Sequence, residues 1–277
     1  MDKQRILRSL SLGLLSLGLV LGLVSCAKST GDSNKRKTEM ASESDNRLSL
    51  DSPPDYHQAA LINVELGLSY LGQGQVARAK TKLVHAIELA PKAPETHAAL
   101  GHFLEMIGEF KDSEREYKKA VSLGHNGSAY NNYGTFLCRR ARFEEADKAF
   151  NRAIEDKGYA RTAEVYENAG LCALKWPSDE KAAEYFNIAI TRDPQRTSAL
   201  LALVELDIKN GNILHAGELL DRYKKIAAPS ARSVWLSIQV AKKSNNNNTV
   251  AKEVLTLKNL FEDSPEYQAY LKSEKAK

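Results

Sequence analysis

A spacing close to 34 residues recurs through most of the chain and restricts its fold more than any other feature of the sequence. Three series of residues share this spacing. A first series of small residues is Gly67, Gly101, Gly134 and Gly170; a second is Ala79, Ser113, Ala146, Ala182, Ala216 and Ala251; a third, of large apolar residues, is Leu83, Tyr117, Phe150, Phe186, Leu220 and Leu255. A period of this length is typical of solenoids built from helix pairs. Small residues let two helices approach closely, and the large residue is predicted to fill the gap to the next pair.

The pattern resembles the consensus of the tetratricopeptide repeat (TPR), a helix-turn-helix unit. The first copy matches it best, at Leu66, Gly67, Tyr70, Ala79, Leu83, Ala86 and Pro91. The last two copies depart from it, with Leu203-Val204 and Ile238-Gln239 where Leu-Gly is expected, and such departures are typical of terminal capping repeats. The resemblance implies an all-α, right-handed superhelix of about six repeats over residues 56–277, whose first helices line a concave groove.

The N-terminus has the features of an export signal with a lipid attachment site. Basic residues in Met1–Arg8 precede an uncharged apolar stretch, Leu10–Val24, which is too short for a helix that spans a bilayer with about 20 residues. Leu23-Val24-Ser25-Cys26 resembles the bacterial lipobox, so residues 1–25 are predicted to be a lipoprotein signal peptide and Cys26 the acylated residue. A plain secretory signal or an uncleaved anchor are the alternatives.

The residue after Cys26 and the polar stretch that follows extend this prediction. Ala27 resembles the residue that sorts Gram-negative lipoproteins to the outer membrane, so we expect a protein held in outer-membrane lipid through acylated Cys26 and facing the periplasm. Residues 26–55 are rich in Lys, Ser, Asp and Asn and end near Pro53-Pro54, which predicts a lipidated flexible tether. A small ordered extension is the alternative.

Charge and motifs argue against several functions. Of 39 basic and 35 acidic residues, Lys3, Arg5, Arg8 and Asp2 precede Cys26, so the remaining chain carries a net charge of only +2, which disfavours a nucleic-acid partner. Gly72–Ala77 fits the dinucleotide-binding fingerprint but follows a helical pattern, so it is interpreted as a turn. The six histidines show no metal-binding spacing. We therefore expect no enzyme, no metal or other cofactor, and no small-molecule substrate.

Two cysteines besides Cys26 lie one repeat apart. Cys138 and Cys172 fall in the first helices of repeats three and four, and export would place them in an oxidising compartment. Since neighbouring helix axes lie about 10 Å apart, the side chains must converge to bond. A disulfide and a pair of buried thiols both remain open on this evidence.

Repeat three carries a more specific resemblance. Ala129–Cys138 (AYNNYGTFLC), together with Arg142-Phe143-Glu144-Glu145-Ala146, resembles the type IV pilus biogenesis lipoproteins of the PilF/PilW type, also called pilotins. The resemblance implies an outer-membrane lipoprotein scaffold that helps the type IV pilus secretin reach the outer membrane and multimerise there. It also implies a Cys138–Cys172 disulfide. Another periplasmic TPR adaptor, for cell-wall enzymes or outer-membrane protein assembly, is the alternative.

Two regions are candidates for partner binding. Leu61, Val64, Leu68 and Leu71 recur at spacings of 3, 4 and 3 on the first predicted helix, so they are expected to form an apolar stripe facing the groove, opposite a buried face with Leu66, Gly67 and Tyr70. Such a stripe suits an amphipathic segment of a partner, unless Pro53–Tyr56 folds back over it. The second candidate is the polar region of repeat three around Asn131 and Thr135.

Overall fold

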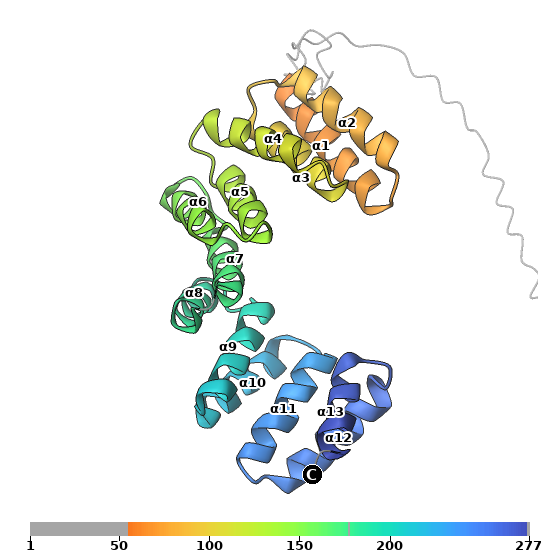
Figure 1. Cartoon of the computed structure of the whole chain (residues 1–277), viewed down its shortest axis with the longest axis vertical. Coiled ribbons are helices and arrows are strands. Elements are labelled where there is room, and N and C mark those ends of the chain that lie inside the picture. Colours follow the sequence, from red (N-terminus) through yellow and green to blue (C-terminus); the bar gives the residue numbers. More distant parts are fainter. Residues whose placement is uncertain (1–54, 177, 276–277) are drawn as a thin grey trace, which may run out of the picture. The chain divides into compact units, whose positions relative to one another are not determined.

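The computed structural model describes residues 55–176 and 178–275, and this part is built from α-helices without a strand (Figure 1). The predicted signal peptide, Cys26 and all of the predicted tether 26–55 except Asp55 lie outside the described residues. No described helix is both long and apolar enough to cross a bilayer. The helices are α1 (Tyr56–Gly72), α2 (Val76–Leu89), α3 (Pro94–Met106), α4 (Phe110–Ser122), α5 (Gly127–Arg139), α6 (Phe143–Glu155), α7 (Thr162–Lys175), α8 (Asp179–Arg192), α9 (Thr197–Asn210), α10 (Ile213–Ile226), α11 (Ala231–Lys243), α12 (Asn247–Leu260) and α13 (Pro265–Lys275).

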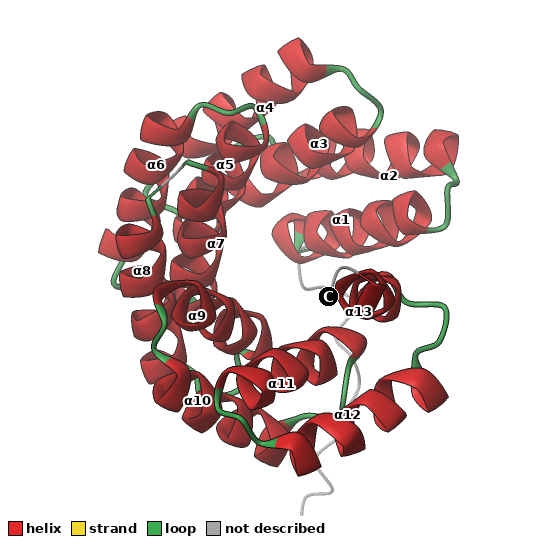
Figure 2. Ribbon diagram, turned by 60° about the horizontal axis from the view of Figure 1, so that its bottom comes forward, coloured by secondary structure: helices red, strands yellow, loops and turns green. Residues whose placement is uncertain are grey.

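Consecutive helices pair, and each pair stacks on the next, as the TPR pattern predicted. The first helix of each pair (α1, α3, α5, α7, α9 and α11) contacts the first helix of the following pair, so these helices form the inner layer of the superhelix (Figure 2). The second helices form the outer layer. The predicted all-α TPR fold with six helix pairs is confirmed.

Short polar residues set the start of several helices. The carboxylate of Asp55 accepts a hydrogen bond from the backbone N–H of Gln58 at the start of α1, at 2.9 Å. Asn126 accepts one from Ala129 in α5, and Ser230 forms a reciprocal capping box with Ser233 in α11. Each cap satisfies a backbone donor that the first helical turn leaves free. In the turn between α1 and α2, Gly74 has a φ of 73°, which supports the interpretation of Gly72–Ala77 as a turn.

In the first four helix pairs the repeated glycine lies directly against the large residue of the second helix. A Cβ atom at Gly67 would lie 2.6 Å from Cγ of Leu83, and one at Gly134 would lie 2.8 Å from the ring of Phe150. A Cβ atom at Gly170 would likewise lie 2.7 Å from Cδ1 and Cε1 of Phe186. The large residue therefore packs on the glycine of its own pair. It also contacts the next pair, as expected: the ring centroid of Tyr117 lies 5.2 Å from that of Phe136 and 6.2 Å from that of Tyr133 in α5, and Leu83 packs with Phe103 of α3.

Burial in the last pair departs from the predicted register. Leu255 was aligned with the large buried residues, but it is 58% exposed, whereas Leu257 is fully buried with Val234 and Ile238. Tyr267 of α13 joins the same cluster. The physical reason is the register: α12 begins 34 residues after α10, so the buried positions Ala216, Leu220 and Tyr223 of α10 correspond to Val250, Val254 and Leu257, and Leu255 lies one residue away from them. The additional helix α13 packs against α11 beyond the sixth pair. The six-repeat pattern did not predict this cap.

The two cysteines of repeats three and four form a disulfide. Cys138 of α5 and Cys172 of α7 are bonded, with a Cα–Cα distance of 5.7 Å, as the family resemblance implied. Both are almost fully buried within the largest apolar cluster of the described chain. The bond joins neighbouring inner-layer helices, so it fixes α5 and α7 directly beneath the concave surface.

Candidate partner-binding groove

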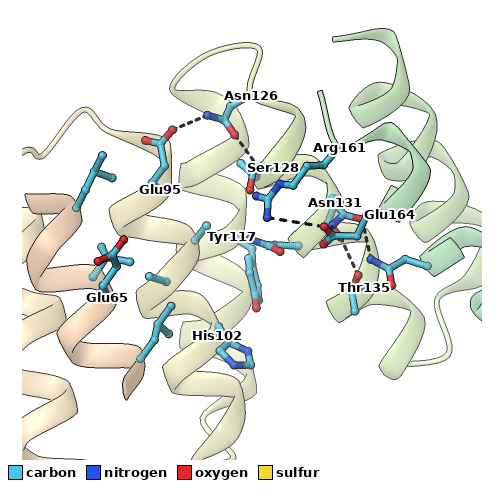
Figure 3. A pocket seen from close by; sticks show the side chains of 18 of the residues that line it. Glu65, Glu95, His102, Tyr117, Asn126, Ser128, Asn131, Thr135, Arg161 and Glu164 are labelled. Atoms are coloured by element: carbon cyan, nitrogen blue, oxygen red, sulfur yellow. Dashed lines mark hydrogen bonds and ion pairs between the residues drawn. The ribbon is translucent and has the colours of Figure 1, made fainter. Parts of the chain in front are cut away.

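A groove of about 610 Å³ runs along the concave face of the first four repeats (Figure 3). Its walls come from the inner-layer helices α1, α3, α5 and α7, from residues at the N-terminal ends of α5 and α7, and from Tyr117 of the outer-layer helix α4. The lining residues are Leu61, Val64, Glu65, Leu68, Glu95, Ala98, Ala99, His102, Tyr117, Asn126, Ser128, Ala129, Asn131, Asn132, Thr135, Arg139, Arg161, Glu164 and Asn168.

The apolar end of the groove includes three of the four residues of the predicted stripe. Leu61, Val64 and Leu68 line it, whereas Leu71 does not: it packs against the cluster around Leu83 and Phe103. At about 100° per residue, Leu61 and Leu68 project within about 20° of each other, and Leu71 lies about 80° from Leu61. Leu71 therefore turns toward the core. Partner binding by the three lining residues stays a prediction.

The face of α1 that was expected to be buried is only partly so. Gly67 is buried and Tyr70 packs on the core, but Leu66 is 41% exposed. Leu66 projects about 100° away from Gly67 around the helix, and no described helix precedes α1 to cover that side. The TPR consensus assumes such a neighbour, which is why the expectation for Leu66 was wrong.

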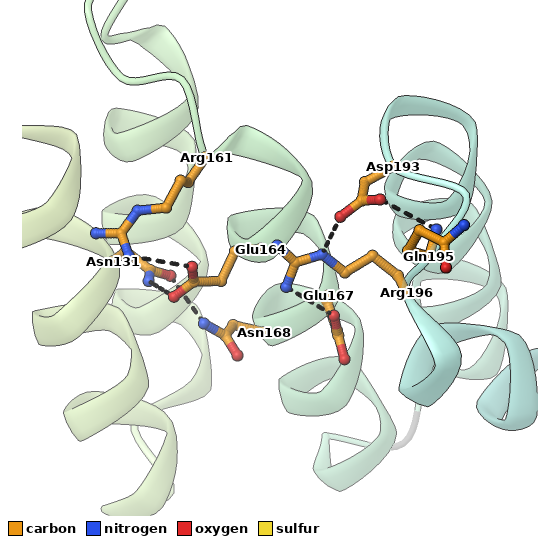
Figure 4. A network of polar contacts seen from close by, with 8 residues as sticks. All are labelled: Asn131, Arg161, Glu164, Glu167, Asn168, Asp193, Gln195 and Arg196. Carbon is orange, nitrogen blue, oxygen red and sulfur yellow. Dashed lines mark hydrogen bonds and ion pairs between the residues drawn. The ribbon is translucent and has the colours of Figure 1, made fainter. Parts of the chain in front are cut away.

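The polar end of the groove is organised by Asn131. This residue is buried at 2% exposure, and its amide is used within the protein: Nδ2 donates to Oε1 of Glu164 at 3.4 Å, and Oδ1 accepts from Nδ2 of Asn168 at 3.1 Å (Figure 4). The hydroxyl of Thr135 donates to the carbonyl of Asn131 at 2.9 Å. These hydrogen bonds are made within the protein, so Asn131 and Thr135 stabilise the wall of the groove and offer few free donors or acceptors to a partner. Their role in partner binding stays a prediction.

The network around Asn131 continues along α7 toward the next repeat. Nη1 of Arg161 lies 3.7 Å from Oε2 of Glu164 (Figure 4). Arg196 forms two ion pairs, from Nη1 to Oε2 of Glu167 at 3.3 Å and from Nε to Oδ2 of Asp193 at 2.9 Å. These contacts connect the inner helices of repeats three, four and five. They fix the positions of polar side chains along the concave surface.

Sequence reasoning missed the acidic residues that share the groove with the apolar stripe. Glu65 lies on α1 between Leu61 and Leu68, and it makes no ion pair within the described part of the chain. Glu95, at the start of α3, accepts a hydrogen bond through Oε1 from Nδ2 of Asn126 at 2.7 Å. Its Oε2 is buried without a hydrogen-bond partner among the described residues (Figure 3). A signal was present, since Glu65 falls inside the apolar stripe.

The basic residues of the groove are held by carboxylates. The guanidinium of Arg139 donates two hydrogen bonds of 2.6 Å to Glu105, whose side chain is 8% exposed. His102 lies on the same wall, and burial lowers its pKa. The charge of Glu105 opposes this lowering, and the charge of Arg139 adds to it. A lowered pKa keeps this imidazole neutral near pH 7.

The chemistry of the groove suits binding of a protein segment. Its lining joins aliphatic side chains to amides and carboxylates, and it is open along one face of four repeats. Among residues 55–176 and 178–275, no three His, Cys, Asp or Glu side chains gather closely enough to hold a metal ion. Amphipathic segments bind to elongated grooves of this kind through a few apolar anchors and flanking polar contacts.

Comparisons with known proteins place the chain among TPR proteins of pilus assembly. A family model of the tetratricopeptide repeat matches residues 137–197. The type IV pilus assembly protein PilF of Pseudomonas aeruginosa is 32% identical over 253 residues, which cover 91% of this chain and 94% of PilF. An uncharacterised protein of Haemophilus influenzae is 38% identical over 120 residues, covering 43% of this chain and 67% of that protein.

Solved structures give the same result for the fold. The structure of P. aeruginosa PilF superimposes with a TM-score of 0.69, covering 79% of this chain and 100% of PilF at 32% identity. PilW, a type IV pilus biogenesis factor, gives a TM-score of 0.67 over 77% of this chain and 99% of PilW, and its 22% identity supports the fold alone.

Proposed function

The chain belongs to the PilF family of type IV pilus assembly TPR proteins, and from this membership we propose that it is a scaffold for the type IV pilus secretin. In this role it promotes outer-membrane targeting and multimerisation of the secretin by binding a secretin segment in the groove of repeats one to four. The observation that carries the proposal is the 32% identity to PilF across 91% of the chain, which covers the groove-forming repeats.

The groove supplies a physical basis for such binding. Leu61 and Leu68 project side by side, and Leu68 is 36% exposed, so an apolar side chain of a partner gains contact area there. The disulfide and the Asn131 network hold the helices that form the opposite wall. A wall fixed in advance costs less conformational entropy on binding. The protein therefore acts by binding alone, without catalysis.

The proposal includes a lipid anchor. After signal peptidase cleavage, acylated Cys26 holds the chain in the periplasmic leaflet of the outer membrane, and residues 26–55 connect it to the repeats. Several acyl chains, at about 0.8 kcal/mol per buried CH₂, make such attachment effectively permanent. An anchored scaffold brings the bound secretin to the membrane in which it assembles.

Leu68→Lys tests the groove. The substitution places a charge in the proposed contact, and loss of one leucine contact, worth about 2 kcal/mol, weakens binding roughly thirtyfold. We expect fewer heat-resistant secretin multimers on gels of outer-membrane fractions. Leu214→Lys is the matched control, because Leu214 is 86% exposed on α10, away from the groove, and should leave multimers at wild-type levels.

The refuting outcomes are separate for the groove and the anchor. Normal multimers with a folded Leu68→Lys chain exclude this groove as the secretin site. Cys26→Ser should move the chain out of the outer-membrane fraction and shift its mass by the missing acyl groups. If the wild-type protein is found soluble and unacylated, the lipid anchor is contradicted. That result does not bear on binding in the groove.

A further inference from the structure

The groove has the opposite charge from the chain as a whole. The full sequence carries a formal charge of +4, and its acidic and basic residues are nearly balanced. In the groove, by contrast, the lining carboxylates are Glu65, Glu95 and Glu164, the lining guanidiniums are Arg139 and Arg161, and His102 is neutral near pH 7.

Both arginines are already neutralised by carboxylates of the protein. Arg139 is bound through two hydrogen bonds by Glu105, which is not itself among the lining residues, and Arg161 lies beside Glu164. These pairs leave Glu65 and Glu95 as carboxylates without a cation within the described part of the chain. The groove therefore presents two uncompensated negative charges.

The surroundings of these two carboxylates point to a donor supplied from outside. Oε2 of Glu95 is buried but has no hydrogen-bond partner among the described residues, and leaving a buried oxygen of this kind unsatisfied is unfavourable, more so when it is charged. Oε1 of the same group is held by Asn126, so the carboxylate is fixed in orientation. Glu65 is exposed and projects about 40° from Leu61 around α1.

We propose that the groove selects a partner segment in which an arginine or lysine stands beside apolar residues, with the cation between Glu65 and Glu95 and the apolar side chains on Leu61 and Leu68. This inference rests on the proposed function and specifies the chemistry of the segment that is bound. Charge complementarity of this kind determines which segment is accepted and how fast it associates, while the apolar contacts provide most of the affinity. Ala98 and Ala99 leave room above α3 for the apolar side chains.

The test uses the full-length chain, purified in detergent, and overlapping 15-residue peptides that cover the type IV pilus secretin of the same organism. We expect the bound peptides to contain Arg or Lys next to Leu, Ile, Val or Phe, and their affinity to fall as salt is raised. Glu65→Gln/Glu95→Gln should weaken binding about tenfold, since two partly exposed ion pairs are removed. Glu218→Gln, an exposed carboxylate on α10, is the matched control and should change nothing.

A second measurement keeps the result independent of folding. Replacing the cation of the best peptide by Gln should weaken binding to the wild-type chain and have little further effect on the double variant, as expected for a direct contact. If replacing the peptide's cation lowers the affinity equally for the wild-type chain and for the double variant, the inference is overturned. The inference is also overturned if the bound peptides lack a cation and yet bind more weakly to the Leu68→Lys variant. The proposed function would stand in that case.

The remaining outcomes separate this inference from the proposed function. If no secretin peptide binds, but a synthetic Leu- and Arg-containing peptide binds in a Glu65- and Glu95-dependent manner, the charge selection stands and the secretin assignment fails. Arg47-Leu48-Ser49-Leu50 of the chain itself also combines a cation with leucines. If Arg47→Ser/Leu48→Ser/Leu50→Ser tightens peptide binding about tenfold, that segment is the occupant and the inference of a partner cation is overturned.

Discussion

Gly134→Ala places a methyl group at the closest contact between the helices of repeat three. The new Cβ would lie 2.8 Å from Cδ1 and Cε1 of Phe150 and 3.2 Å from the backbone carbonyl oxygen of Ala146. Phe150 is 1% exposed and packed in the largest apolar cluster of the described chain, so moving its ring disturbs that cluster. The contact with the carbonyl oxygen of Ala146 requires the backbones of α5 and α6 to move apart as well.

Two opposing effects determine the size of the change. Alanine is better than glycine in a helix interior by about 1 kcal/mol, whereas overpacking a close-packed core costs about 1–3 kcal/mol. Because the contact involves backbone as well as a ring, we expect overpacking to win, with a net loss of about 1–2 kcal/mol. Gly217→Ala in α10 is the matched control: its nearest neighbour would be Cγ1 of Val240 at 4.0 Å, so the helix preference of about 0.5–1 kcal/mol should appear as a gain.

Thermal unfolding followed by far-ultraviolet circular dichroism distinguishes the two variants. At about 2–4 °C per kcal/mol for a domain of this size, Gly134→Ala should lower Tm by several degrees, and Gly217→Ala should raise it by a few. If both variants raise Tm equally, glycine at position 134 is not required by packing. The explanation of the 34-residue glycine series would then be wrong.

Three further predictions concern the disulfide, the last repeat and a histidine in the groove. Closing a loop with a sequence separation of 34 should stabilise the fold by roughly 3–4 kcal/mol, so Cys138→Ser/Cys172→Ser should lower the urea midpoint, and free thiols in the wild-type chain on non-reducing mass analysis would contradict the bond. Leu257→Ala should cost about 2–5 kcal/mol in urea unfolding, while Leu255→Ala should change stability by less than about 0.5 kcal/mol; the reverse order would restore the register in which Leu255 is the buried residue. The pKa of His102 is lowered from its ordinary value of 6.5, so the unfolded chain binds more protons between the folded pKa and 6.5. The contribution of His102 to stability is therefore complete above pH 6.5 and is lost as pH falls through the folded pKa, and His102→Asn should flatten the wild-type pH dependence of Tm in that interval.

The sequence alone was sufficient for the six helix pairs and their turns, although not for the capping helix α13. The series of Gly67, Gly101, Gly134 and Gly170 repeats a local requirement: each glycine must accept the large residue that follows it by 16 positions. A requirement of this kind involves only one helix pair, so it is visible in a single repeat and becomes unmistakable when it recurs. The positions of the turns, including the one at Gly74, follow from the same local chemistry.

The ends of the superhelix depended on the tertiary structure. Leu66 occupies a consensus position, but such a position is buried only when a neighbouring repeat covers it, and no described helix precedes α1. At the other end, a strict 34-residue period from Ala216, Leu220 and Tyr223 leads to Val250, Val254 and Leu257, so the burial of Leu257 follows the period and the exposure of Leu255 reflects an alignment that is off by one residue. The period gives no indication of α13, which packs against α11.

The groove shows the same division. The spacing of Leu61, Val64, Leu68 and Leu71 correctly placed an apolar stripe on α1, but the 80° width of that stripe spans both the groove and the core, and only packing against Leu83 and Phe103 assigned Leu71 to the core. The sequence predicts a polar region around Asn131, yet the burial of Asn131 and its hydrogen bonds to Glu164 and Asn168 depend on a helix more than 30 residues away. Periodicity determines which side of a helix a residue occupies. The burial of that residue and its hydrogen bonds depend on contacts with residues of other repeats. The period does not specify which residues meet across the boundary between two repeats.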